Sequence, residues 1–350
     1  MTHPGSYFDR LYTDLEGTFL SGSADGTIRR WSSHSGDEQM VYTWHSQRIF
    51  DIVLLNDGTS FLSASADGAI CQWGTFSGGP YNVFRVNENP VTALAVISAK
   101  PDDFVRCFLS AGKTPSICKW NLLYDARQRK RRKDEKLKIF TGVPERTGYL
   151  LLLKGEFERT FLSGSADSGV GTIRHWNVDT GALIMTYKGH TTYVTGLEDL
   201  EDGTFLSVSA DCTICRWCIK TGECMHTFDC DTHSKLALFA DRTFLSLTWA
   251  KRGIDHKDLS DKIVRTYATP ASTPSHMLVL PDDTVLVGCC NGTIYHFQTP
   301  LSDTKEKTRR LLRSVHEELS TMPPVGSYPG GFIYRTLKAG WPLLGACLTT

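Results

Sequence analysis

GTFLSGSADGTIRRW, from Gly17 to Trp31, is the stretch that decides the fold, because the chain repeats it. Three close copies and three weaker ones share its apolar run and its place before a turn or a terminal aromatic residue; they lie at residues 59–73, 106–120, 159–176, 203–217, 242–249 and 283–297. Seven units at a period of roughly 40 residues indicate a repeat architecture, in which each unit buries its apolar faces against its neighbours.

Each unit predicts four strands. Successive side chains of residues 19–24 point to opposite faces of a strand, and small residues occur on both faces. This pattern suits a strand packed between other sheets. Asp25 and Gly26 predict a two-residue hairpin turn, because such turns need a positive φ. Residues 27–31 then return as the partner strand. An apolar run before this pair and a run after it that ends in threonine and an aromatic residue complete a four-stranded blade.

The fifth unit and the residues before it contain the most complete motif of the chain. Gly189 and His190 stand before a strand, Asp211 lies in the turn and Trp217 closes the next strand. This combination resembles the WD40-repeat family, and the resemblance covers residues 3–297. It implies an all-β fold, a seven-bladed WD40 β-propeller with four-stranded antiparallel blades, as a single domain over residues 3–340. The blades are expected to end near Trp31, Trp73, Trp120, Trp176, Trp217, Lys257 and Phe297.

The resemblance also implies a hydrogen-bonded tetrad of histidine, serine, aspartate and tryptophan in three blades. The expected tetrads are His3, Ser23, Asp25 and Trp31; His45, Ser65, Asp67 and Trp73; and His190, Ser209, Asp211 and Trp217. The same residue types make a catalytic triad, but a triad needs one exposed nucleophile beside its base. Because the set recurs in several blades, we interpret it as structural and expect no enzyme activity.

Composition favours a soluble intracellular protein. The 350 residues are 41% hydrophobic, which provides a large core, and a propeller keeps this length in one domain. The formal net charge is zero, so the whole molecule has no general attraction to nucleic acid. The sequence contains no apolar run of about 18 residues, and its start does not resemble a signal peptide. We therefore expect no membrane contact and a cytoplasmic location.

The eleven cysteines raise a zinc hypothesis, above all Cys212, Cys215 and Cys218. On a strand, a spacing of three residues sends side chains to opposite faces. Six extended residues span roughly 20 Å, whereas thiolates that share a zinc ion each lie about 2.3 Å from it. We therefore expect no metal and no cofactor, and reduced thiols that act as small buried hydrophobic groups.

A basic insertion at residues 127–138 departs from the repeat. Its core is Arg127, Arg129, Lys130, Arg131, Arg132 and Lys133. Such a cluster is typical of a nuclear-localisation signal, which would place the protein in the nucleus, or of a phosphate-binding surface. The third alternative is a solvated loop. The cluster contains no aromatic residue for base stacking, so nucleic acid is not the favoured partner.

The sequence after residue 298 also departs from the repeat. Residues 302–320 predict an amphipathic helix, since apolar residues recur there at helical spacing. Residues 332–337 echo residues 263–267 and are predicted to form a closing outer strand for the last blade, which otherwise has three strands and an open edge. Residues 341–350 form the remaining tail.

Loops that enter the blades offer a candidate binding face for a protein partner. Its residues are Gln47, Arg48, Glu88, Asn89, Tyr193 and Lys235. Because aromatic residues and arginine carry much of the energy of interfaces, this face suits a non-catalytic scaffold or recruiting subunit, monomeric within a larger complex. The alternatives are an RNA-associated or ribosome-assembly propeller that uses the basic insertion and, less favoured, a propeller enzyme.

Overall fold

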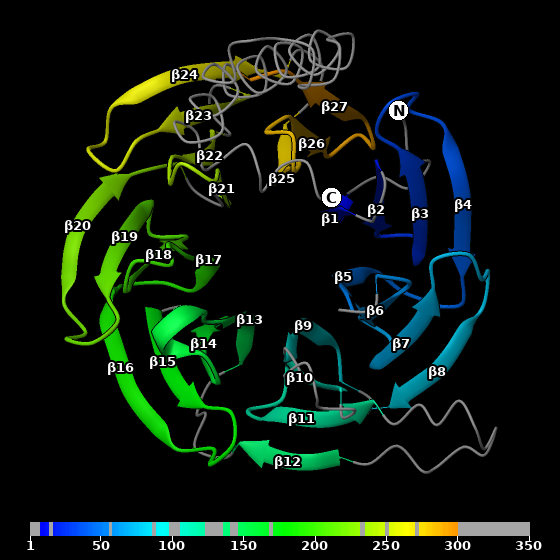
Figure 1. Ribbon diagram of the computed structural model, residues 1–350, viewed down its shortest axis with the longest axis horizontal. Helices are drawn as coiled ribbons and strands as arrows, with labels where there is room; N and C mark the ends of the chain where they lie inside the picture. The colour runs from blue at the N-terminus through cyan, green and yellow to red at the C-terminus, as the bar shows by residue number, and fades with distance from the viewer. Residues whose placement is uncertain are drawn as a thin grey trace, which may run out of the picture. The chain divides into compact units, whose positions relative to one another are not determined.

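The computed structural model describes residues 8–13, 17–55, 58–85, 89–97, 106–122, 136–140, 146–167, 171–231, 235–248, 252–269 and 273–299. All of them belong to the first of two compact units, residues 1–299 and 300–350. The predicted helix, closing strand and tail, the core of the basic insertion, His3 and Glu88 lie outside the described residues. The described part is a ring of seven antiparallel sheets that follow one another in chain order (Figure 1).

The strand bounds are as follows. The first three blades comprise β1 (Phe8–Thr13), β2 (Thr18–Ser23), β3 (Thr27–Ser32) and β4 (Glu38–Thr43); β5 (Ile49–Leu54), β6 (Ser60–Ser65), β7 (Ala69–Gly74) and β8 (Pro80–Arg85); and β9 (Val91–Ile97), β10 (Arg106–Gly112), β11 (Ile117–Leu122) and β12 (Lys136–Phe140). The fourth comprises β13 (Thr147–Leu152), β14 (Thr160–Ser165), β15 (Gly171–Asn177) and β16 (Leu183–His190), with a short 3-10 helix at Gly155–Phe157. The fifth and sixth comprise β17 (Val194–Asp199), β18 (Thr204–Ser209), β19 (Thr213–Cys218) and β20 (Cys224–Asp229); and β21 (Leu236–Leu238), β22 (Phe244–Thr248), β23 (Gly253–Lys257) and β24 (Ile263–Ala268). The seventh comprises β25 (Pro274–Val279), β26 (Val285–Cys289) and β27 (Ile294–Phe297).

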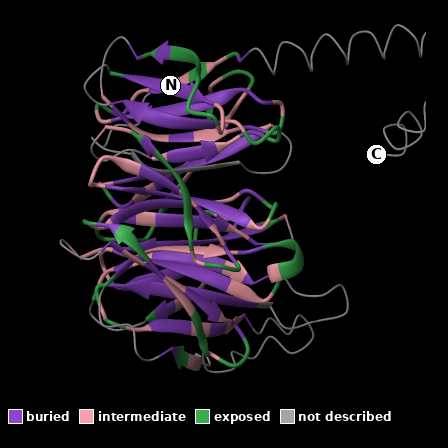
Figure 2. Cartoon of the chain, turned by 90° about the vertical axis from the view of Figure 1, so that its left-hand side faces the viewer, coloured by how far each residue is buried: buried purple, intermediate pink, exposed green. Residues whose placement is uncertain are grey.

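Each blade runs outward from the centre of the ring. The first strand of every blade lies nearest the centre and the fourth lies at the circumference (Figure 1). The second strands are the most buried, and all six residues of β2 and of β6 are buried, as both faces of those strands pack on neighbouring blades. Figure 2 shows that the interior of the ring is mostly buried and that exposed segments lie toward its outside. β25 contacts β1, so the described blades close the ring. The predicted seven-bladed propeller is confirmed.

Asp25 and Gly26 lie in the turn between the second and third strands, but the predicted two-residue hairpin is wrong: the last paired residues are Gly22 and Ile28, and Gly26 but not Asp25 has a positive φ. Gly26 has φ 83° and Gly68 has φ 78°, conformations that glycine adopts without a steric cost. The amide of Gly26 donates to the carbonyl of Ser23 at 3.2 Å. In the fifth blade Cys212 takes the glycine position with φ 69°. A cysteine there carries some backbone strain, because residues with a Cβ rarely adopt this region.

Outer-strand aromatic residues lock consecutive blades together. The Tyr42 ring of β4 meets the rings of Phe61 and Trp73 edge-on, with centroids 5.1 and 5.6 Å apart. Its hydroxyl donates to the carbonyl of Thr75 in the second blade at 2.6 Å. Tyr187 repeats both features against the fifth blade. The threonine-aromatic pair at the end of each unit is therefore the contact between blades.

The sixth blade ends at Lys257, where the first five blades place tryptophan. Lys257 is only 7% exposed, and its ammonium group donates to the carbonyl of Asp229 at 2.9 Å and to Asp261 Oδ1 at 3.0 Å. The Ser246 hydroxyl, which corresponds to the indole-bound serine of other blades, is buried without a hydrogen-bond partner. Because this blade has no indole at that position, the buried Ser246 hydroxyl makes no hydrogen bond, which lowers the stability of the fold.

Two buried histidines occupy the position before the closing residue of their blades. His175 lies 2.8 Å from Thr160 Oγ1 through Nε2, and His256 lies 2.6 Å from Thr243 Oγ1 in the same way. Each Nδ1 is buried without a partner. Burial lowers the pKa of His175 to about 4 and also lowers that of His256, because protonation would place an unpaired charge in the core.

We expect acid to destabilise the protein well above the range in which its carboxylates titrate. Below pH 6.5 the histidine at position 175 binds a proton in the unfolded chain but stays neutral in the folded protein. The contribution of His175 to the free energy of unfolding is therefore full above pH 6.5 and falls as the pH drops toward 4. At pH 5 the loss from His175 alone is about 2 kcal/mol. Urea unfolding at pH 7.5 and pH 5 measures it. The His175→Gln variant should show the smaller pH dependence, and equal dependence in both proteins would contradict this assignment.

Candidate functional site

In the second blade, four side chains are linked in series by hydrogen bonds. His45 Nδ1 lies 2.9 Å from Asp67 Oδ2, and His45 Nε2 lies 2.7 Å from Ser63 Oγ. The indole of Trp73 donates to the same Ser63 oxygen at 2.8 Å. All these groups are satisfied when the Ser63 hydroxyl donates to His45 Nε2 and the N–H at His45 Nδ1 donates a hydrogen bond to the Asp67 carboxylate. The loop after β4, two strands and a turn are thereby joined.

The fifth blade repeats this chain. His190 lies 3.1 Å from Asp211 and 2.7 Å from Ser207, and Trp217 donates to Ser207 at 2.7 Å. Burial raises the pKa of Asp211, but hydrogen bonds from Thr213 and the Thr191 amide, together with His190, outweigh it and hold the pKa below its ordinary value. Burial lowers the pKa of His190 more than Asp211 raises it. At neutral pH this network is therefore a carboxylate beside a neutral imidazole.

The serines expected in the tetrads were wrong by two residues. Ser21, Ser63 and Ser207 accept the indole hydrogen bonds, in place of Ser23, Ser65 and Ser209. Both members of each pair share one strand face, because strand side chains alternate with period two. Only the earlier serine lies at the depth of the indole. The later one caps the turn: Ser65 Oγ donates to the Gln47 carbonyl and accepts the Asp67 amide.

Other blades keep parts of the tetrad. In the first, Trp31 donates to Ser21 at 2.8 Å and Asp25 accepts from the Thr27 amide, while His3 lies outside the described residues. The third and fourth blades keep the tryptophan-serine bond, through Trp120 and Trp176. A catalytic role does not fit the complete tetrads: Ser63 and Ser207 are fully buried, and each oxygen already contacts an indole and an imidazole.

The loops that enter the blades lie at one end of the ring. This follows from antiparallel connections, which bring each entry loop to the same end as the turn between the second and third strands. Backbone hydrogen bonds join the two: the Ala66 amide donates to the Arg48 carbonyl at 2.9 Å, and the Ala210 amide to the Tyr193 carbonyl at 3.1 Å. We call this end the entry-loop face.

Five of the six candidate binding residues lie on the described entry-loop face: Gln47, Arg48, Asn89, Tyr193 and Lys235. Gln47 and Asn89 are exposed, and the other three are half-buried. The Lys235 ammonium group lies 4.4 Å from the centre of the Tyr149 ring and donates to the Thr195 carbonyl at 2.8 Å, so it joins the sixth blade to the fourth and the fifth. The ammonium group of Lys235 therefore helps to hold the blades together.

The cysteines of the zinc hypothesis occupy separate environments. Cys215 is buried in β19, whereas Cys212 lies in the preceding turn and Cys218 at the strand end. Within the described ranges, no group of three histidine, cysteine, aspartate or glutamate side chains is placed to hold a metal ion.

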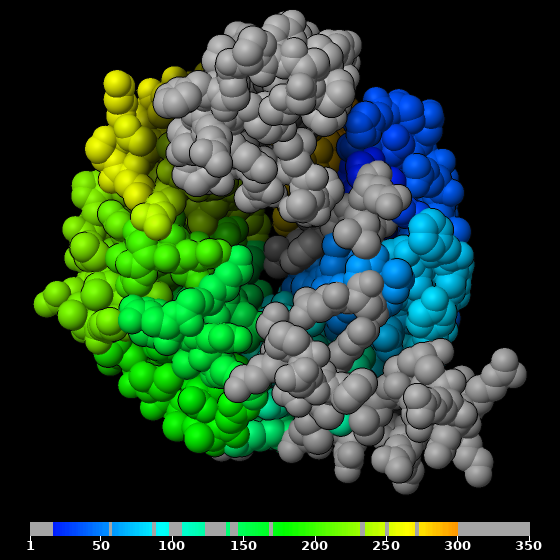
Figure 3. All heavy atoms as spheres, viewed as in Figure 1, coloured from blue at the N-terminus to red at the C-terminus, as the bar shows by residue number. Residues whose placement is uncertain are grey.

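Two segments match a protein-family model, described as WD domain, G-beta repeat. They are residues 36–74 and residues 181–218. The first contains His45, Asp67 and Trp73, and the second contains the fifth-blade tetrad. The matched segments are therefore those in which the histidine, serine, aspartate and tryptophan network is complete. The other described sheets follow the same strand order. Figure 3 shows that the described residues follow one another around the ring in chain order, from blue to orange.

Proposed function

We propose that this chain, a seven-bladed propeller that carries WD40 repeats, is a non-catalytic interaction scaffold or recruiting subunit whose entry-loop face binds a protein partner. WD40 propellers typically act in this way. The observation that supports the proposal is that the residues that hold the entry loops in place are different from the residues that these loops expose. The histidine networks hold the loops from below, while residues such as Gln47 remain exposed above them.

Arg48 and Tyr193 are the anchors we assign to this face. Their carbonyls accept hydrogen bonds from the Ala66 and Ala210 amides, which fix the backbone of both loops. Arginine and tyrosine supply large contact areas at interfaces, and a preformed loop loses little entropy when it binds. Such a face fits a peptide or loop of a partner, and we place the protein in the cytoplasm.

An RNA-associated role rests on the basic insertion. That insertion connects β11 and β12, whose facing ends lie opposite the entry-loop face. A partner bound through it would therefore use a different surface. The described chain contains no helix long and apolar enough to cross a bilayer.

Changing Arg48 and Tyr193 together to alanine should remove specific partners without unfolding the protein. Quantitative affinity purification from the protein's own cells measures this, with thermal unfolding as the check on stability. The matched control changes Lys154 and Lys220, two exposed lysines at the opposite end that pair with Glu201 and Glu156. This control should retain the partners.

The outcomes separate the two functions. Partners lost in the Arg48/Tyr193 variant and kept in a chain lacking residues 127–138 support the entry-loop face. Retention on RNA that depends on residues 127–138 and weakens with salt would favour the RNA role instead. Unfolding of the double variant would assign these side chains to the framework.

A further inference from the structure

A groove opens at the circumference between the fourth and fifth blades. Its volume is about 300 Å³, and its lining combines Gly189 and Thr191 with residues of the fifth blade: Asp211, Thr213, Cys215, Trp217, Cys224 and Thr227. The ring of Trp217 lies at the base, since a Cβ built on Gly189 would come within 2.9 Å of its Cη2. Trp217 is only 1% exposed, so its ring is the closed floor of the groove, and the absence of a side chain at position 189 leaves the space above this floor open.

The second blade has the same framework but covers the corresponding place with its own side chain. Trp44 precedes His45 as Gly189 precedes His190, and the two histidines make the same bonds. The Trp44 ring packs edge-on against His45, with centroids 5.5 Å apart. The guanidinium of Arg85 lies 5.8 Å from the centre of the Trp44 ring. An aromatic ring and a cation thus fill this position internally.

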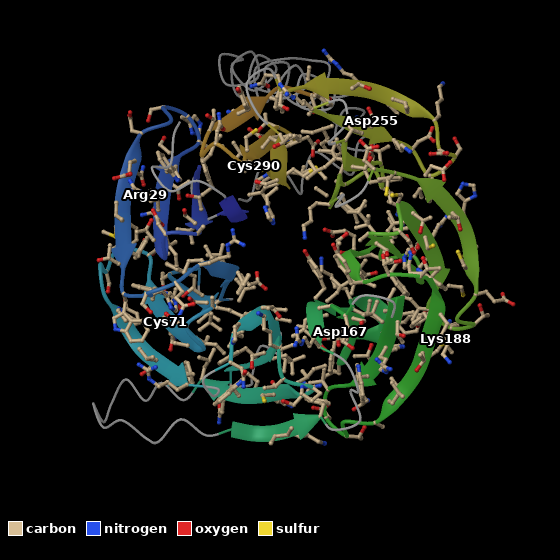
Figure 4. All side chains as sticks on the ribbon, turned by 180° about the vertical axis from the view of Figure 1, so that it is seen from behind. Arg29, Cys71, Asp167, Lys188, Asp255 and Cys290 are labelled. Carbon is tan, nitrogen blue, oxygen red and sulfur yellow. The ribbon has the colours of Figure 1, made fainter. Side chains whose placement is uncertain are left out.

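The cysteines of the two blades also differ in burial. Cys71 of the second blade and Cys215 of the fifth hold the same place in their third strands, opposite Ser63 and Ser207. Cys71 is 0% exposed, whereas Cys215 is 5% exposed and has the exposed Cys224 thiol beside it. Burial raises the pKa of Cys215 to about 12 and raises that of Cys71 further (Figure 4 labels Cys71).

The charges at the ends of the two outer strands, β8 and β20, are opposite. Arg85 pairs with Ala69 at the end of β8, and Asp229 pairs with Thr213 at the end of β20, so Asp229 stands where the second blade has its cation. Asp229 is exposed, and Asp211 is held as a carboxylate in the groove wall. Lys188, labelled in Figure 4, precedes Gly189 on β16, and strand alternation directs it to the other face.

We propose that the groove beside Gly189 binds a partner segment that presents an aromatic ring next to an arginine or lysine. The ring takes the place that Trp44 occupies in the second blade and stacks toward Trp217. The cation replaces Arg85 and meets Asp229. The proposal rests on the scaffold function and adds to it a second docking surface, at the circumference, with a stated ligand chemistry.

Alkylation of Cys224 by iodoacetamide reports occupancy of the groove, because this exposed thiol lines it. The probes are three short peptides: acetyl-Arg-Trp-Arg-amide, acetyl-Glu-Trp-Glu-amide and acetyl-Arg-Ala-Arg-amide. At millimolar concentration, the first should slow labelling of Cys224 severalfold, and the other two should not. Cys218 is the internal reference. Hydrogen bonds from Thr221 lower its pKa, so it labels readily, and it does not line the groove.

Gly189→Trp should fill the groove from within and slow Cys224 labelling with no peptide present. Because a side chain at 189 crowds Trp217, that variant could lose stability, and Thr227→Trp fills the groove from the opposite wall instead. Asp229→Arg should abolish the preference for the basic over the acidic peptide. Equal protection by all three peptides, or no protection by any, would overturn the proposal.

A second copy of the chain is the competing occupant. Dimerisation that Gly189→Trp abolishes would show that the groove serves self-association, and would overturn the proposal as well. The Arg48/Tyr193 double variant should retain peptide protection of Cys224. Failure of the groove experiment therefore leaves the entry-loop function standing, and loss of entry-loop partners leaves the groove standing.

Discussion

Replacing Trp73 with alanine should lower the free energy of unfolding by about 3–5 kcal/mol. The indole is fully buried, stacks on Phe61 at 6.0 Å and receives the edge of Tyr42 from the preceding blade. It also provides the hydrogen bond to Ser63. The substitution thus opens a cavity between two blades and removes one donor from the tetrad. Equilibrium unfolding in urea measures the loss.

Trp73→Phe is the matched control. Phenylalanine retains most of the ring packing but cannot donate to Ser63, which remains bonded to His45. We expect a loss of about 1–2 kcal/mol from the missing hydrogen bond and the smaller ring. If phenylalanine cost as much as alanine, the hydrogen bond rather than the packing would dominate. If neither change had an effect, this blade would not limit the stability of the ring.

Deleting residues 330–350 should destabilise the propeller by about 3 kcal/mol and promote aggregation. We propose that residues 332–337 pair with β27, because the described seventh sheet has three strands where six other sheets have four. Without that strand, β27 would present an open edge to other chains. Light scattering and thermal unfolding of the truncated protein test this. A monomeric product with unchanged thermal stability would refute the closing strand.

Point variants test the register of the same strand. The echo of residues 263–267 aligns Leu337 with Tyr267, which is 7% exposed and meets the Phe297 ring at 5.8 Å. Leu337→Asp should therefore reproduce most of the effect of deletion, since it buries a charge at this position. Leu337→Tyr should be tolerated, because tyrosine fills this position in β4, β16 and β24.

The environments of Lys257 and Gly189 show what a linear pattern misses. Lys257 looks like a surface residue in the sequence, yet it is buried with bonds to Asp229 and Asp261. Gly189 looks like part of the repeat framework in the sequence, yet it lines a groove, whereas Trp44 stands at the equivalent position of the second blade. A comparison of residues 44 and 189 before the two histidines was the available sequence signal.

The sequence by itself determined the number of blades and the strand order within them. These features follow from local rules: a period of two along strands, positive φ at Asp-Gly turns and recurrence of Trp73-like residues. Only the tertiary structure decided that Ser63 rather than Ser65 completes the tetrad, and that the circumference is open beside Gly189. Both outcomes depend on depth and register across strands that are distant in the chain, which alternation along a single strand does not encode.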